Sequence, residues 1–358
     1  MRALATILLG AAAVCAGASA ARAESDHAAI ARAALGEVIR PGYAALADAT
    51  ASLDQDIAAL CSTPSPASLG AARREFAATA AAWSKVEILR FGPIVRDHRY
   101  EHLFFWPDPK GVGERQIREA LAKRDETVTK QATLSGKSVG LQGLTALEYL
   151  LYGDGADDLT SGDGAFRCAY ARAVAANGAA IAKAVAADWA DGSSYAKAFL
   201  DPGPDAAYHA PKEVTLDLFK SFTAGIELVR DQKLGKPLGE TPETARPKLA
   251  AFWRSGQSLA NAAGNLDGVR ALFADGGLAP IVAADSPGVE KSVLFDLGHA
   301  IEVLDGIGAP MAELVENPEL RAKVEALRVA LKSAGKTAAD AIARGANLAF
   351  GFNAMDGD

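Results

Sequence analysis

The chain has 358 residues, with 37 basic and 44 acidic side chains and a formal net charge of −7. This acidic balance argues against a nucleic-acid partner, because binding to a phosphate backbone requires clustered Lys and Arg. Half of the residues are hydrophobic, and period-two alternation is nearly absent, so we predict an all-α protein that is long enough for two domains.

The first 23 residues have the pattern of an export signal. Arg2 is followed by an apolar run over residues 4–18 and by small residues that end at Ala23. The apolar run is too short for a transmembrane helix, and no later segment reaches the required length. We therefore expect cleavage after Ala23 and a periplasmic protein without a transmembrane anchor.

Removal of residues 1–23 leaves two cysteines, Cys61 and Cys168. In an oxidising compartment, two remaining cysteines more often form a disulfide than a catalytic thiol pair. We predict a Cys61–Cys168 disulfide that ties the first helices to the helix after residues 141–153.

Amphipathic helices make up the N-terminal half, which we assign to residues 24–200. A helix over 26–60 is expected to kink at Pro41-Gly42. In the next helix apolar residues recur every seven positions, and Glu87 and Arg90 point toward this apolar side. An ordered turn follows, with three consecutive aromatic residues at 104–106 that we interpret as packing against the bundle.

The remaining predicted elements are again helices separated by turns. The first half ends with helices over 138–152 and 166–198, and the proline- and glycine-rich stretch 201–205 marks the boundary between halves. The C-terminal half, residues 201–358, contains predicted helices over 213–232, 241–263, 294–306 and 317–342.

Two of these helices have similar sequences. Residues 141–153 align with residues 294–306, so that Thr145 matches His299 and Glu148 matches Glu302. Such internal similarity predicts two helical-bundle halves related by duplication. On the second helix His299 and Glu302 lie three residues apart and share a face, which we place at the edge of the buried side.

Carboxylate and imidazole groups are suitable ligands for iron or another divalent metal. If the halves pack face to face, Glu148, His299 and Glu302 converge on one metal site, with Glu87 as a fourth ligand and Arg90 balancing the charge. Burial of an unpaired carboxylate costs several kcal/mol per ion. A salt-bridge network of Glu87, Glu148 and Arg90 is therefore an equal alternative. For His299, the alternative is that it caps or fills a seam between helices with Glu302 as its hydrogen-bond partner.

Three motifs carry a resemblance to a known family. They are the sequences RFGP at 90–93, FFWPDPKG at 104–111 and GLTALEYLLYG at 143–153. Together they resemble the imelysin-like family of bacterial envelope proteins, and the similarity extends over nearly the whole exported chain. The resemblance implies an all-α fold of two bundle-like halves, a functional site between them and a connection to bacterial iron uptake.

The family signature is Gly, any residue, His, any two residues and Glu. Gly143 and Glu148 match it, but Thr145 stands where the signature has histidine. We expect Gly143, Thr145 and Arg90 to bind the ligand or to support the residues that do. His299 from the other half is a candidate for the missing imidazole.

The leading hypothesis is an exported protein that binds iron, a related metal or an iron-carrying small ligand between its halves, together with envelope components of iron uptake. A second hypothesis is a metallopeptidase-like hydrolase, since founding family members were described as insulin-cleaving proteases. The sequence lacks the His-Glu-any-any-His helix of common zinc peptidases. A third hypothesis is an envelope interaction module without a ligand.

Overall fold

The structure, a computed structural model, describes residues 26–348. These residues form helices joined by turns, with no strand among them. The prediction of an all-α protein is therefore confirmed. The predicted export signal, residues 1–23, lies outside the described residues. Within 26–348, none of the helices is long and apolar enough to cross a membrane.

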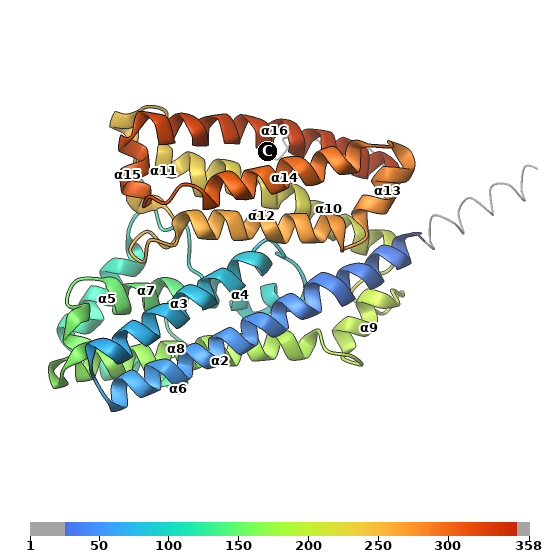
Figure 1. Cartoon of the computed structure of the whole chain (residues 1–358). Coiled ribbons are helices and arrows are strands. Elements are labelled where there is room, and N and C mark those ends of the chain that lie inside the picture. The colour runs from blue at the N-terminus through green and yellow to red at the C-terminus, as the bar shows by residue number, and fades with distance from the viewer. Residues whose placement is uncertain (1–25, 349–358) are drawn as a thin grey trace, which may run out of the picture.

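Helices that precede residue 201 form one layer of the molecule, drawn from blue to yellow-green in Figure 1. In this layer α2 packs against both α3 and α8. The principal helices are α2 (Arg40–Ser62), α3 (Pro66–Val86), α7 (Gly143–Tyr152) and α8 (Ala165–Asp188). The shorter elements are η2 (Gly92–His98), α4 (Arg99–Leu103), α5 (Val112–Lys123), η3 (Glu126–Val128), α6 (Gln131–Leu134), η4 (Val139–Leu141), η5 (Ala156–Thr160), η6 (Gly162–Gly164) and α9 (Ser194–Leu200).

Helices that follow residue 210 form the second layer, which ends in orange and red in Figure 1. In this layer α14 packs against both α12 and α16. The principal helices are α10 (Pro211–Glu227), α12 (Ser258–Ala274), α14 (Val289–Asp305) and α16 (Pro318–Gly345). The shorter elements are η7 (Leu228–Gly235), α11 (Lys236–Leu238), η8 (Pro242–Thr244), η9 (Pro247–Leu249), α13 (Leu278–Asp285) and α15 (Met311–Glu316).

The first long helix is irregular close to the predicted kink. Residues 26–33 are helical, η1 (Ala34–Ile39) is a π-helix, and α2 begins at Arg40. Pro41 has no backbone N–H to donate to the carbonyl four residues earlier, so the regular α-helical ladder is interrupted there. The kink expected at Pro41-Gly42 thus takes the form of a π-helical turn just before the proline.

The two layers meet where α12 packs against α3. Two glycines of α12 allow this close approach. A Cβ atom at Gly264 would lie 2.7 Å from the Cβ of Ser84, and one at Gly268 would collide with the carbonyl oxygen of Lys85. Buried apolar side chains from both layers form one continuous core, so the layers are packed together and not merely joined by the chain.

A buried ion pair connects the layers beside this contact. Glu87 follows the last turn of α3 and is fully buried, and its Oε1 accepts a hydrogen bond from Lys233 Nζ at 2.6 Å. Its Oε2 accepts hydrogen bonds at 3.1 Å from the side-chain amides of Asn261 and Asn265. Burial lowers the pKa of Lys233 to about 8, and Glu87 opposes this shift. Both oxygens of Glu87 therefore have protein donors.

The helix predicted over 241–263 begins later than expected, so this prediction was wrong for residues 241–257. Only the two short turns η8 and η9 occur before α12 starts at Ser258. Pro247 disfavours helical backbone at the residue before it, and Gly256 has a φ angle of 74° that no α-helix contains. This irregular segment forms one wall of the pocket described below.

The predicted disulfide between Cys61 and Cys168 is confirmed. It connects the last turn of α2 to the first turn of α8, with Cα atoms 5.6 Å apart and a sequence separation of 107 residues. The bond therefore closes a long loop that contains α3 and α7.

Replacing both cysteines with serine should lower the free energy of unfolding by about 4 to 5 kcal/mol, the chain-entropy value for a loop of roughly 100 residues. Urea denaturation of the oxidised wild type and of the double variant measures this difference. Reductant should destabilise the wild type and leave the variant unchanged. An equal response of both proteins to reductant would contradict this role for the bond.

Lys233→Met should lower the free energy of unfolding by about 3 to 5 kcal/mol, because it leaves the Glu87 carboxylate buried without its cation. The double variant Glu87→Gln/Lys233→Met should lose less free energy of unfolding than the two single variants lose together. Lys85→Met is the matched control, since Lys85 of α3 also pairs across the two layers, with Asp267 of α12 at 3.0 Å, but is exposed. It should cost less than about 1 kcal/mol. Additive single effects at 87 and 233 would refute the coupling.

Candidate functional site

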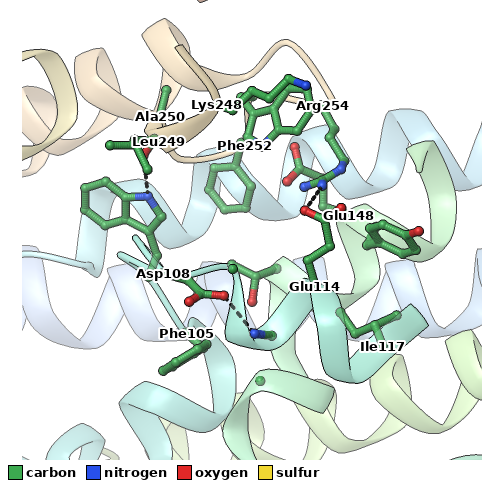
Figure 2. Close-up of a pocket in the computed structure, with 17 residues that line it drawn as sticks. Phe105, Asp108, Glu114, Ile117, Glu148, Lys248, Leu249, Ala250, Phe252 and Arg254 are labelled. Atoms are coloured by element: carbon green, nitrogen blue, oxygen red, sulfur yellow. Dashed lines mark hydrogen bonds and ion pairs between the residues drawn. The ribbon is translucent and has the colours of Figure 1, made fainter. Parts of the chain in front are cut away.

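A pocket of about 90 Å³ lies between the two layers (Figure 2). Such a volume accommodates a few water molecules or one end of a small ligand. Its walls come from the aromatic turn, the start of α5, helix α7 and the irregular segment before α12. The lining residues are Phe105, Trp106, Asp108, Gly111, Gly113, Glu114, Ile117, Gly140, Thr145, Glu148, Tyr149, Lys248, Leu249, Ala250, Phe252, Trp253 and Arg254.

Glu148 is the buried carboxylate of this pocket, with only 3% of its surface exposed. Its Oε1 accepts two hydrogen bonds at 2.8 Å, from the backbone N–H and from the hydroxyl of Ser255. Burial raises the pKa of Glu148 above its ordinary value of 4.5, while the Ser255 bonds and the charge of Arg254 act in the opposite direction. A residue of the second layer therefore holds a carboxylate of the first.

Thr145 and Gly143 belong to the same helix but have different environments. Thr145 lies one turn before Glu148 and lines the pocket, and its hydroxyl forms no hydrogen bond within residues 26–348. Gly143 has a φ angle of 74°, and a Cβ atom there would lie 2.6 Å from the carbonyl oxygen of His102. Gly143 thus lets α7 start directly beside that backbone, whereas Thr145 and Glu148 present oxygen atoms to the pocket.

The three consecutive aromatic residues divide between the core and the pocket. Phe104 is buried and packs against Phe252, with ring centroids 4.9 Å apart. Phe105 and Trp106 line the pocket, and Trp106 donates a hydrogen bond from Nε1 to the carbonyl oxygen of Leu249 at 3.0 Å. The interpretation that this turn packs against the bundle is therefore confirmed for Phe104 and for the partly buried Trp106, which packs against the core, but not for Phe105.

Charged side chains surround the opening of the pocket. Arg254 donates to Glu114 at 2.6 Å, and its guanidinium lies over the ring of Trp253 at 4.3 Å. Lys248 lies over the same ring at 5.3 Å and forms no ion pair within the described residues. Asp108 accepts hydrogen bonds from two backbone N–H groups at the start of α5. Figure 2 shows Asp108 facing Glu114 and Glu148 across the pocket.

His299 and Glu302 lie away from this pocket, exposed on α14. Phe295 stacks on the His299 ring and is itself 72% exposed. The buried side of α14 consists of four apolar residues, namely Val293, Leu297, Ala300 and Leu304. The expectation that His299 and Glu302 lie at the edge of the buried side is corrected, because this apolar stripe turns both side chains toward the opposite side of the helix.

Glu87 and Arg90 are also separate from the pocket. Glu87 is committed to Lys233 and the two asparagines. Arg90 is exposed and donates to the hydroxyl of Tyr100 at 2.6 Å. The alternative network of Glu87, Glu148 and Arg90 is therefore not formed, since each of the three has a different partner.

The structure does not bring the four predicted metal ligands together. Within residues 26–348, no group of three or more His, Cys, Asp or Glu side chains is arranged to hold a metal ion. Of the predicted ligands, Glu148 lines a pocket, Glu87 belongs to a buried ion pair, and His299 and Glu302 lie on an exposed helix face.

Sequence reasoning missed Ser255 and Arg254 as residues around Glu148, because it assigned both to a helix. Two signals could have placed them in a loop. Pro247 interrupts the proposed helix, and Gly256 directly follows Ser255. A backbone N–H outside a helical ladder is free to donate to a side chain, as the N–H of Ser255 does to Glu148.

Comparison with known proteins now identifies the family. The imelysin family model, peptidase M75, matches residues 39–338. The chain belongs to the imelysin family. No curated protein sequence matches it. This membership agrees with the resemblance carried by the motifs at 90–93, 104–111 and 143–153.

Two solved structures have the imelysin fold of this chain. An imelysin-like protein from Psychrobacter arcticum 273-4 superposes with a TM-score of 0.73 at 19% identity, over 92% of this chain and 98% of the other. A putative iron-regulated protein A precursor from Parabacteroides distasonis ATCC 8503 gives a TM-score of 0.76 at 15% identity, over 89% and 95%. At these identities the likeness establishes the shared fold.

Glu148→Gln should leave the free energy of unfolding at neutral pH unchanged or higher. A carboxyl whose native pKa is raised contributes stability below pH 4.5, and this contribution is lost as the pH rises through the native pKa. Gln keeps an oxygen that accepts the Ser255 bonds and carries no charge to desolvate. Urea denaturation between pH 4 and 8 tests this, with Glu302→Gln as the exposed control. A large loss of stability in Glu148→Gln at neutral pH would contradict the assignment.

Proposed function

We propose that this imelysin-family chain is an exported, iron-related binding protein whose ligand occupies the pocket at Glu148. The observation that carries the proposal is the state of the Glu148 carboxylate. It is buried beside a pocket, and both of the side-chain hydrogen bonds it accepts within residues 26–348, from the N–H and the hydroxyl of Ser255, fall on Oε1. Buried carboxylates need a cation, a proton or a metal in addition, and the pocket provides space for one.

The donor set favours a metal that arrives with ligands of its own. Within the described residues, the pocket offers the carboxylate of Glu148 and the free hydroxyl of Thr145, while Asp108 and Glu114 already have partners. Two oxygen donors are fewer than the four to six ligands that iron and similar ions usually take. The cargo is therefore an iron-carrying small ligand, of which the pocket receives the metal end.

The opening of the pocket suits an anionic chelate. Within residues 26–348, Lys248 has no acidic partner, and Arg254 forms its ion pair with Glu114. Many small iron chelates are built from carboxylates, which Lys and Arg bind through charge-assisted hydrogen bonds. Trp106 and Trp253 provide flat apolar walls between these charges.

Two further points support a role in iron uptake at the cell envelope. The family resemblance implies this role, and one protein of the same fold is named a putative iron-regulated protein A precursor. The export signal predicted over residues 1–23 would deliver the chain to the periplasm, where envelope components of iron uptake are the expected partners. No feature of the pocket favours a hydrolase over a binding protein.

Wild-type protein should bind ferric citrate, and Glu148→Gln should weaken this binding by about tenfold or more, because the variant removes the only pocket carboxylate without a salt bridge or helix cap. Glu302→Gln and His299→Gln, both on the exposed face of α14, should bind like the wild type. Isothermal titration with ferric citrate, free ferrous ion and iron-free citrate measures these affinities.

The outcomes of this titration separate the hypotheses. If iron-free citrate binds with the same affinity as ferric citrate, iron is not what the pocket recognises. Loss of binding in His299→Gln or Glu302→Gln would move the site to α14. Thr145→His restores the imidazole of the family signature and should raise the affinity for free ferrous ion. If the protein digests a denatured protein substrate and a chelator blocks this digestion, the hydrolase hypothesis would be favoured.

A further inference from the structure

A second groove, of about 360 Å³, lies where the segment after α3 meets α10 and η7. It has no residue in common with the pocket at Glu148. Its lining residues are Ile88, Arg90, Phe91, Asp217, Lys220, Ser221, Ala224, Gly225, Glu227, Leu228, Asp231 and Gln232. This volume is large enough for a ligand of the size of an amino acid or a short peptide.

Most charges in this groove already have partners. Asp217 pairs with Lys220 at 3.7 Å, and Asp231 pairs with Arg230 through two hydrogen bonds. Arg90 and Glu227 are different, because neither forms an ion pair within residues 26–348. Among the described residues, the groove therefore contains a cation from the first layer and an anion from the second layer that form no ion pair.

The guanidinium of Arg90 is held in place by Tyr100 and still has N–H groups available for a ligand. Its Nη2 donates to the hydroxyl of Tyr100 at 2.6 Å, and its central carbon lies 4.7 Å from the centre of the same ring. A guanidinium has five N–H groups, so several remain available to a carboxylate. This arrangement keeps the fork in a defined position, which lowers the entropy lost when a ligand binds.

The hydroxyl of Ser221 adds a third recognition element. Ser221 of α10 lines the groove and is only 5% exposed. Its Oγ forms no hydrogen bond within residues 26–348, so it can donate to or accept from a ligand in the groove. The apolar residues Ile88, Phe91 and Leu228 line the same groove. An available hydroxyl beside two opposite charges suits a polar ligand.

From these contacts we propose that the groove binds a small zwitterion of the amino-acid or short-peptide class. The carboxylate of the ligand pairs with Arg90, and its ammonium group pairs with Glu227. Ser221 donates to or accepts from the polar backbone of the ligand. A ligand with a single charge can pair with only one of the two protein charges, so the groove favours a ligand that carries both.

The zwitterion site does not depend on the iron-carrying ligand proposed for the other pocket. It rests on different residues, and Glu148→Gln should leave it intact. Failure of iron binding would therefore not contradict it, and failure of zwitterion binding would not contradict the role of Glu148.

Isothermal titration with alanine, dialanine and trialanine tests the proposal and finds the preferred distance between the charges. The best of the three should bind at millimolar concentration or below. Blocking its amino group by acetylation, or its carboxyl group as an amide, should weaken binding by about tenfold each.

Two charge-removing variants make the assignment specific. Arg90→Gln should reduce the affinity for the zwitterion to that of its amide and leave the affinity for the amide unchanged. Glu227→Gln should reduce the affinity for the zwitterion to that of its acetylated form and leave the affinity for the acetylated form unchanged. Glu302→Gln, an exposed acidic residue of α14, is the control. Binding of blocked and unblocked forms with equal affinity, or no binding of any probe by folded wild-type protein, would overturn the proposal.

Discussion

The ion pair between Glu87 and Lys233 is the interaction on which the arrangement of this molecule depends. Both side chains are almost fully buried, and they belong to different layers. Asn261 and Asn265 complete the coordination of the carboxylate from α12. A buried pair of this kind has few alternative arrangements, because any shift of one layer leaves a charge without its partner. It therefore fixes how α3, η7 and α12 sit against one another.

The position of the ligand pocket follows from this fixed contact. Lys233 Nζ also lies 4.0 Å from the ring centre of Trp106, which lines the pocket. Trp106 in turn holds the 239–257 segment through Leu249, and that segment carries Ser255 to Glu148. The buried ion pair and the pocket are thus connected through a continuous series of contacts.

Two buried glutamates illustrate the difference between a structural and a functional carboxylate. Glu87 has a cation on one oxygen and two amides on the other, so no further ligand is needed. Glu148 has two bonds on one oxygen, no cation in direct contact and a pocket beside it. Sequence alone could not separate them, because both occupy inward positions of amphipathic helices. Their difference is decided by Lys233 and Ser255, which lie far away in the chain.

The fold was predictable to the extent that local patterns determine it. Heptad spacing, prolines and the two cysteines predicted the helices, the kink near Pro41 and the disulfide. The candidate site was predictable only in part, since Glu148 and Thr145 were found through the motif of α7. His299 and Glu302 share a helix face, as expected. Whether that face is buried or exposed depends on which apolar stripe of α14 packs against its neighbours. The whole segment before α12 was assigned to the wrong structure, so the partner of Glu148 was missed.

The most direct test of the central claim is the position of iron in a crystal of the wild-type protein soaked with ferric citrate. Anomalous diffraction at the iron absorption edge locates the metal without assumptions about its ligands. The account predicts a single strong peak in the pocket, within reach of Glu148 and Thr145. A peak beside His299 and Glu302 on α14, with none in the pocket, would contradict it.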